Sequence, residues 1–213
     1  MQIQQIPNQL ITGQLQKLNT AKLSGIALHH MAHPLWGVKE VESYHVKSLG
    51  WLAIGYNFWV SFDGVIYEGR GFNIGAGVAS QNSTVISVGF QGDYENANDK
   101  MPTTQFNAGI DIINYIKGKV PSISKVGGHK DFMATSCPGR HFPLVEMIKG
   151  IKRSDFVMFK DVKQDDYAYN HIKKLKECGI VNGDTAGNFN PDMPITRRDM
   201  SVVAGNVLTY LGK

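Results

Sequence analysis

The sequence of 213 residues is poor in cysteine, with only Cys137 and Cys178. Proteins that rely on disulfides carry many cysteines at close spacing, so a disulfide framework is excluded as the basis of this fold. Long apolar runs are also missing, and no stretch reaches the roughly 20 residues that a membrane-spanning helix requires. We therefore expect a globular protein without membrane insertion.

The N-terminus lacks the basic start and the apolar core of a secretory signal peptide. We therefore expect the protein to be made in the cytoplasm of its host without a signal peptide. Blocks of basic residues are absent too, because the Lys and Arg residues behind the net charge of +4 are spread along the chain. Nucleic-acid binding needs a concentrated basic surface and is not indicated. A mild positive charge suits an anionic surface such as a Gram-positive wall, although it carries little weight alone.

The apolar residues that are present gather in segments with the periods of strands and helices. Strands are predicted at residues 24–29, 53–61, 65–69, 85–90 and 123–128, and helices at 38–49, 103–117 and 142–152. Asp63 and Gly64 join two of the strands and are typical of a tight hairpin. Strands mixed with helices and a hairpin predict an α/β fold in which helices cover a mixed β-sheet.

The pattern changes after the polar residues 152–155. Ala168, Ile172 and Leu175 mark a predicted helix that ends at Gly179. A second helix is predicted after Thr196, with Asp199 three residues on as a variant of the capping box. We therefore predict an α/β domain at residues 1–155 and a small α-helical module at 156–213. A unit of this size has marginal stability alone, so it is expected to dock on the first domain or to self-associate.

Histidine and cysteine occur at a spacing that suits a metal ion. His129 follows the strand predicted at 123–128, and Cys137 comes eight residues later in a loop that can bring both side chains to one point. Either His29 or His30 would add a third ligand. Because neighbouring residues on a strand face opposite sides, only one of the two can bind the same metal ion, and the spacing does not show which one. Such a set leaves the fourth tetrahedral position of Zn²⁺ open for water, as in hydrolytic sites.

These residues belong to a longer series of motifs. In chain order they are Ile26-Ala27-Leu28-His29-His30, Gly50-Trp51, Ile54-Gly55-Tyr56-Asn57-Phe58, Asp63-Gly64-Val65-Ile66-Tyr67-Glu68-Gly69-Arg70, Ser87-Val88-Gly89-Phe90, Gly92-Asp93, Gly128-His129-Lys130-Asp131 and Cys137-Pro138-Gly139. With them, residues 20–150 resemble the zinc amidases shared by phage lysins, bacterial wall hydrolases and animal peptidoglycan recognition proteins. The resemblance implies hydrolysis of the amide between N-acetylmuramic acid and the L-alanine of the peptidoglycan stem peptide.

The resemblance also implies roles for individual residues. The ligands of Zn²⁺ would be His29, His129 and Cys137. Tyr56 would lie beside the metal water and orient it, and Thr135 would contact the developing oxyanion. Some relatives carry a lysine where Thr135 stands, so in this chain that contact would be neutral.

The C-terminal residues resemble a single S-layer homology repeat. Its markers are Phe159-Lys160-Asp161-Val162, the stretch from Ala168 to Ile172, Gly179-Ile180-Val181-Asn182-Gly183, Phe189-Asn190-Pro191 and Ile195-Thr196-Arg197-Arg198-Asp199-Met200. The resemblance implies that an anionic secondary wall polysaccharide is the partner, with Arg197 as its cationic contact. Because such repeats commonly work in threes, oligomerisation through this module is a further expectation.

The sequence therefore predicts a peptidoglycan hydrolase, specifically a phage or prophage endolysin for a Gram-positive host that acts on the cell wall after release. The alternative is a peptidoglycan-binding module without catalysis, and the presence of all three ligand candidates favours the enzyme. A nucleobase deaminase also binds zinc through His and Cys, but its Pro-Cys-x-x-Cys and His-x-Glu motifs are absent. His45, Arg70 and Cys178 are interpreted as packing or architectural residues.

Overall fold

The computed structural model describes residues 2–98, 100–150, 152–153 and 158–210. The chain divides into two compact units, Met1–Lys152 and Arg153–Lys213. The border predicted between residues 155 and 156, and part of the polar stretch at 152–155, lie outside the described residues. Within the described ranges, no helix has the length and apolar character needed to cross a bilayer.

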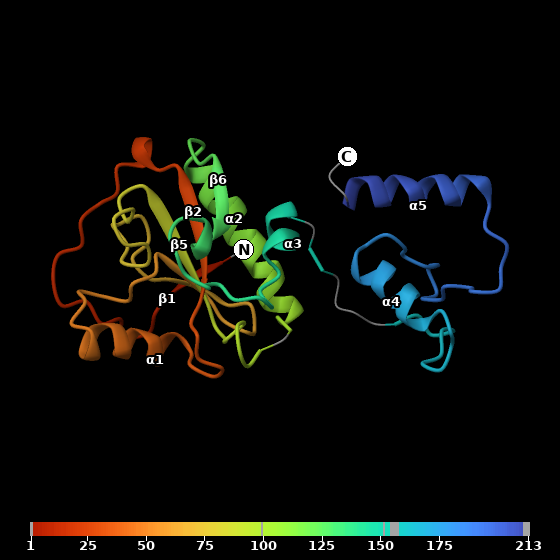
Figure 1. Ribbon diagram of the computed structural model, residues 1–213, viewed down its shortest axis with the longest axis horizontal. Helices are drawn as coiled ribbons and strands as arrows, with labels where there is room; N and C mark the ends of the chain where they lie inside the picture. Colours follow the sequence, from red (N-terminus) through yellow and green to blue (C-terminus); the bar gives the residue numbers. More distant parts are fainter. Residues whose placement is uncertain (1, 99, 151, 154–157, 211–213) are drawn as a thin grey trace. The chain divides into compact units, whose positions relative to one another are not determined.

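The first unit is built on a mixed β-sheet (Figure 1). The sheet has six strands in the order β1-β4-β3-β5-β2-β6. The strands are β1 (Ile3–Gln5), β2 (Gly25–His30), β3 (Phe58–Val60), β4 (Ile66–Glu68), β5 (Val85–Phe90) and β6 (Lys125–Gly128). β3 and β4 form an antiparallel hairpin, and the other neighbouring strands are parallel. The predicted α/β fold with a mixed sheet is confirmed.

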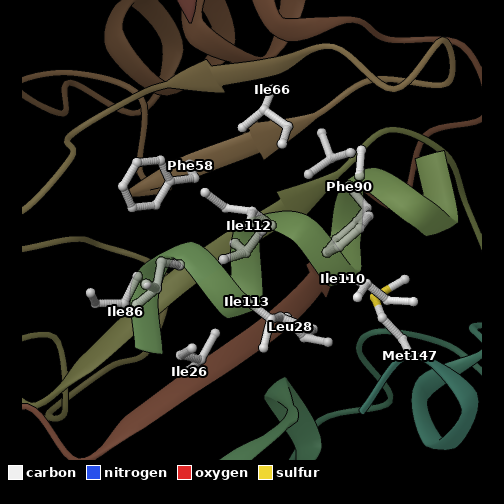
Figure 2. Close-up of a cluster of buried hydrophobic side chains, with 14 of the residues drawn as sticks. Ile26, Leu28, Phe58, Ile66, Ile86, Phe90, Ile110, Ile112, Ile113 and Met147 are labelled. Carbon is white, nitrogen blue, oxygen red and sulfur yellow. The ribbon is translucent and has the colours of Figure 1, made fainter. Parts of the chain in front are cut away.

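One face of this sheet carries most of the apolar core. Helix α2 (Thr103–Lys119) lies along it and buries its isoleucines against the strands, as Figure 2 shows for Ile110, Ile112 and Ile113. α3 (Leu144–Lys149) adds Met147 to the same cluster. Because side chains alternate along a strand, Ile26 and Leu28 of β2 face α2, and the residues between them face the other side.

The opposite face is covered by α1 (Val38–Ser43), which continues into the π-helical turn η2 (Tyr44–Ser48). Val38 and Val41 of α1 pack there with Tyr56 and Trp59 in a second apolar cluster. His29 lies on this face at the carboxyl end of β2, and the larger apolar cluster lies on the α2 face.

Several predicted elements are shorter than expected, among them the helix predicted at 142–152, which is observed as Leu144–Lys149. The strand predicted at 53–61 is confined to Phe58–Val60, because the carbonyl groups of Ala53 and Ile54 accept hydrogen bonds from the guanidinium of Arg70 rather than from a neighbouring strand. The helix predicted at 38–49 is α-helical only to Ser43. Strand β1 and the short η1 (Thr20–Lys22) have no counterpart among the predicted elements.

The second unit contains α4 (Tyr169–Glu177) and α5 (Arg197–Tyr210), joined by a long loop. Its small core consists of Phe159, Val162 and Ile172, with the ring of Phe189 packed at a tilt against Phe159, 5.2 Å between ring centroids. The loop is shaped by the Asp161 carboxylate, which accepts hydrogen bonds from two backbone amides at 2.8 and 2.7 Å. None of the described side chains of α5 is buried.

Candidate functional site

Three side chains converge at the carboxyl end of β2. One nitrogen of His29, one nitrogen of His129 and the sulfur of Cys137 lie within 4.8 Å of one another. Sγ of Cys137 is 3.8 Å from Nδ1 of His29, and the two imidazole rings are 4.3 Å apart at their centroids. These are separations that a single tetrahedral metal ion can bridge with all three ligands.

The chain brings the ligands together through adjacent parallel strands. β2 ends in His29 and His30, and its neighbour β6 runs directly into the 3₁₀ turn η3 (His129–Asp131), so both histidines emerge at the same edge of the sheet. The turn is fixed by Asp131, whose Oδ2 accepts from the amide of Gly128 at 2.8 Å. The loop that follows returns to it through a 2.8 Å hydrogen bond from the Lys130 amide to the Cys137 carbonyl.

The protonation of these groups is set by burial. Desolvation lowers the pKa of both imidazoles, and for His29 the neighbouring His129 and His30 lower it further. Desolvation raises the pKa of the Cys137 thiol to about 12, against a smaller opposing effect of the hydrogen bond from the His30 amide. The imidazoles are therefore neutral, and the thiol needs a nearby cation to ionise.

The donor set fits zinc. Nε2 of His129 is buried without a hydrogen-bond partner among the described residues, and a bound metal ion would give this nitrogen a partner. Two neutral imidazoles and one thiolate are the nitrogen and sulfur donors that zinc prefers. A divalent cation would supply the positive charge that the buried thiol requires.

His30 points to the other side of β2, away from this cluster. Its Nδ1 accepts a 3.0 Å hydrogen bond from the amide of Tyr94 and lies 3.6 Å from the Asp93 carboxylate. Its pKa is lowered by burial, against an opposing effect of Asp93. The structure thus places His29 in the cluster and His30 outside it, a choice that the sequence spacing left open.

Tyr56 lies beside the cluster, in the segment between η2 and β3. Its ring centroid is 5.4 Å from that of His29 and 5.7 Å from that of Trp59. Burial raises the pKa of the phenol well above its usual range, and the nearby Cys137 adds to this effect. The phenol therefore stays protonated and is a hydrogen-bond donor at neutral pH.

Thr135 is exposed on the loop before Cys137. Its hydroxyl oxygen accepts a hydrogen bond from the Cys137 amide at 3.2 Å, which leaves the hydroxyl hydrogen available to a ligand. The structure thus places an uncharged hydroxyl two residues before the candidate ligand Cys137.

His45 and Arg70 support the segment that carries Tyr56. His45 accepts from the Gly55 amide at 3.1 Å through Nδ1 and stacks on Trp51 at 4.6 Å. Burial, and secondarily Arg70, lower the pKa of His45 to about 4. The Arg70 guanidinium donates to backbone carbonyls, including that of Ile54 at 2.8 Å, so both residues act here as architecture.

Ser87 and Asn57 are two buried polar residues of this face to which sequence reasoning gave no role. Oδ1 of Asn57 accepts from the Ser87 amide at 2.9 Å, while its Nδ2 donates to the carbonyls of Gly71 and Asn73 at 2.7 Å. The Ser87 hydroxyl is buried without a hydrogen-bond partner among the described residues. Both residues stand inside sequence motifs quoted above, but a motif does not reveal that a polar atom is buried.

Arg197, the candidate contact for a wall polymer, belongs to the second unit. It is exposed and opens helix α5, immediately after Thr196. The Thr196 hydroxyl accepts from the Asp199 amide at 3.1 Å and lies 2.6 Å from the Asp199 carboxylate, so the predicted cap is present. Arg198 is equally exposed.

Two family models match the chain. Residues 19–140 match the model described as N-acetylmuramoyl-L-alanine amidase, and residues 159–201 match the S-layer homology domain. The first match contains all three residues of the candidate metal centre together with Tyr56. The second covers most of the second compact unit, including Arg197.

Similar proteins include the peptidoglycan-recognition protein SC2 of Drosophila melanogaster, 35% identical over 128 residues, which are 55% of this chain and 68% of that protein. Peptidoglycan-recognition protein SC1a of the same species is 38% identical over 107 residues, 49% of this chain and 57% of that protein, so the chain spans little more than half of this relative. Among solved structures, the amidase LysC from Clostridium intestinale URNW superimposes with a TM-score of 0.59 at 25% identity, covering 67% of this chain and 92% of that one. Bumblebee PGRP-SA gives a TM-score of 0.55 at 28% identity, covering 61% and 83%.

Proposed function

We propose that this chain, which belongs to the N-acetylmuramoyl-L-alanine amidase family, is a zinc-dependent hydrolase of the amide between N-acetylmuramic acid and the L-alanine of the peptidoglycan stem peptide. The convergence of His29, His129 and Cys137 within 4.8 Å carries the proposal. Three protein ligands leave one tetrahedral position for water or substrate, which is the arrangement of catalytic rather than structural zinc sites.

The residues of the site have distinct tasks in this reaction. His29, His129 and Cys137 would hold zinc, which when bound polarises a carbonyl group and acidifies a water molecule. Tyr56, kept neutral by burial, would donate a hydrogen bond to the carbonyl oxygen as negative charge develops on it. Thr135 would add a second neutral donor through the hydroxyl hydrogen that its contact with the Cys137 amide leaves unused.

The alternative is a protein that binds peptidoglycan without cutting it, which is favoured by the similarity to peptidoglycan-recognition proteins. The two functions are separated by digesting purified bacterial walls and assaying new amino termini and new reducing sugars. An amidase releases amino termini without reducing sugars. A pure binding protein releases neither, and a glycosidase would release the sugars.

We further propose that the S-layer homology unit anchors the enzyme to an anionic secondary wall polysaccharide. Arg197 would supply the cationic contact at the N-terminal end of α5, where the helix dipole also favours an anion. Three apolar side chains of α5, those of Met200, Val202 and Leu208, are more than half exposed, and they support self-association of this unit with other copies. Sedimentation of the purified chain at increasing concentration tests that association.

The combination of a wall-cutting unit with a wall-binding unit supports the role of a phage or prophage endolysin that reaches the wall after release. Tethering the catalytic unit to the wall raises its local concentration on the substrate. Addition of the purified protein to Gram-positive cells, followed by turbidity, tests this role. Lysis is expected, and intact cells at all protein concentrations would contradict it.

A further inference from the structure

The orientation of His29 leaves one of its nitrogens in need of a partner. Nδ1 faces the sulfur of Cys137 at 3.8 Å, so Nδ1 is the atom that would bind the metal. A neutral imidazole that binds a metal through one nitrogen carries its hydrogen on the other, and histidine ligands usually donate that hydrogen to an acceptor. Nε2 of His29 is buried and has no hydrogen-bond partner among the described residues.

The Ser87 hydroxyl is a second buried polar group on the same face of the sheet. Ser87 pairs with Ala27 in the parallel register of β5 and β2, and His29 lies two residues after Ala27. Since residues two apart on a strand face the same side, the side chains of Ser87 and His29 point in the same direction. Oγ of Ser87 also has no hydrogen-bond partner within the described part of the chain.

Gly77 lies next to both groups. A Cβ built on Gly77 would lie 2.5 Å from Oγ of Ser87 and 3.4 Å from Nε2 of His29. Both atoms therefore approach one point, and they do so beneath a residue that has no side chain. A side chain at position 77 would contact both atoms.

We propose that Ser87 is a positioning residue for the metal ligand His29: its hydroxyl accepts the hydrogen of Nε2 while Nδ1 binds the metal. The inference rests on the proposed zinc centre. The backbone that carries this hydroxyl is held by the 2.9 Å hydrogen bond from the Ser87 amide to Oδ1 of Asn57. The contact fixes the ring orientation and keeps the lone pair of Nδ1 directed at the metal.

The burial of Ser87 supports this role. Ser87 is fully buried and lies between the core residues Ile86 and Val88. A buried hydroxyl without a partner destabilises a protein, and alanine at this position would avoid that cost. The metal-bound state gives the hydroxyl its partner, because only then is Nε2 of His29 required to carry a hydrogen.

The test compares Ser87→Ala with the wild-type chain in two measurements on the full-length protein. Zinc affinity is measured by competition with a chromophoric chelator, and the stability of the metal-free protein by thermal denaturation. We expect roughly 10- to 100-fold weaker zinc binding, the usual effect of losing a partner of a metal ligand. The melting temperature of the metal-free variant should be unchanged or higher, because the lost hydroxyl had no partner.

The matched control is Ser122→Ala, which removes a hydroxyl that donates to the Leu23 carbonyl at 2.8 Å, outside the metal centre. This variant should bind zinc as tightly as the wild type. Wild-type zinc affinity in Ser87→Ala would overturn the inference, and so would a loss of affinity shared by Ser122→Ala. A melting temperature of metal-free Ser87→Ala that falls in step with the zinc affinity would instead show a packing role and overturn it too.

A spectroscopic readout distinguishes this inference from the proposed function. Cobalt(II) in place of zinc gives absorption bands that report ligand geometry, and these bands should shift in Ser87→Ala and stay unchanged in Ser122→Ala. No measurement in this set depends on hydrolysis, so an inactive wild type that binds zinc would contradict only the proposed function. A wild type that binds neither zinc nor cobalt would overturn both.

Discussion

The ring of Tyr56 lies directly against Gly89, where an added Cβ would stand 2.6 Å from Cδ2 of the tyrosine. Gly89 is also the residue of β5 that pairs with His29 of β2. The missing side chain at Gly89 therefore lets the tyrosine ring approach the candidate metal ligand His29 across the sheet. The position of the phenol depends on this contact as much as on its own segment.

Gly89→Ala should consequently displace Tyr56. Forcing a methyl group into this packed contact is expected to cost about 1–3 kcal/mol of stability and to lower kcat on soluble muropeptide, while zinc content stays at the wild-type value. Chemical denaturation, metal analysis and kinetics measure the three quantities. Gly118→Ala is the control, because nothing lies within 4 Å of its added Cβ, and it should leave activity unchanged. Equal kcat for Gly89→Ala and the wild type would show that the ring position does not matter.

Tyr56→Phe removes the phenol and keeps the ring. Because the phenol is expected to stabilise the transition state rather than hold the metal, the variant should retain zinc and lose activity by roughly 10²-fold or more, as for one oxyanion donor. In the wild type, the raised pKa of Tyr56 keeps the phenol protonated in the alkaline range. Ionisation of Tyr56 should therefore not affect the pH dependence of wild-type activity. Turnover of the variant at the wild-type rate would reduce Tyr56 to a packing residue.

His45 should make stability depend on pH. Its pKa falls from 6.5 to about 4 on folding, so the unfolded chain binds the proton more readily. The contribution of neutral His45 to the free energy of unfolding is present above pH 6.5 and is lost as the pH falls from 6.5 towards 4. The loss is at most about 3 kcal/mol. His45→Asn keeps an acceptor for the Gly55 amide and does not titrate.

The measurement is urea denaturation of both metal-free proteins at pH 7 and pH 4. The wild type should lose more stability than His45→Asn over this interval. Other buried histidines also have lowered pKa values, so only the difference between the two proteins reports on His45. Identical losses would show that His45 is not held neutral by the fold.

Arg197→Ala should weaken binding to purified walls without changing hydrolysis of soluble muropeptide. Arg198→Ala is the matched control, because it removes the same charge from the neighbouring exposed position. Pull-down by walls should fall for Arg197→Ala, and the difference from the control should shrink as salt is raised, since screening weakens contacts between exposed charges. Equal pull-down of both variants would leave Arg197 without a specific role.

The sequence predicted the elements whose pattern is local. β5 was predicted with the bounds that the structure has, and the helix expected at 103–117 lies within α2, because buried strands and amphipathic helices have clear periods. β1 was missed because three residues give no period, and its pairing with β4 depends on residues more than 60 positions away. The strand expected at 53–61 was too long because Arg70 takes up its carbonyl groups, a contact no local pattern reveals.

The candidate site divides in the same way. His129 and Cys137 could be paired from their spacing, but the choice of His29 over His30 came from a resemblance, and the structure places the two on opposite sides of β2. Ser87 could not be found at all, because its importance lies in a buried hydroxyl without a partner. The burial of this hydroxyl near His29 depends on how β5 and β2 pair in the folded chain, which the sequence pattern does not show.

The central claim is that His29, His129 and Cys137 hold the zinc on which amide hydrolysis depends. The direct measurement is a titration of the metal-free chain with zinc, following new amino termini released from purified walls. Activity should rise with added zinc and level off at about one equivalent. Cys137→Ser should stay inactive throughout. His30→Ala should respond like the wild type, because the side chain of His30 faces away from the cluster. Full activity of the metal-free chain in the presence of a chelator would contradict the claim.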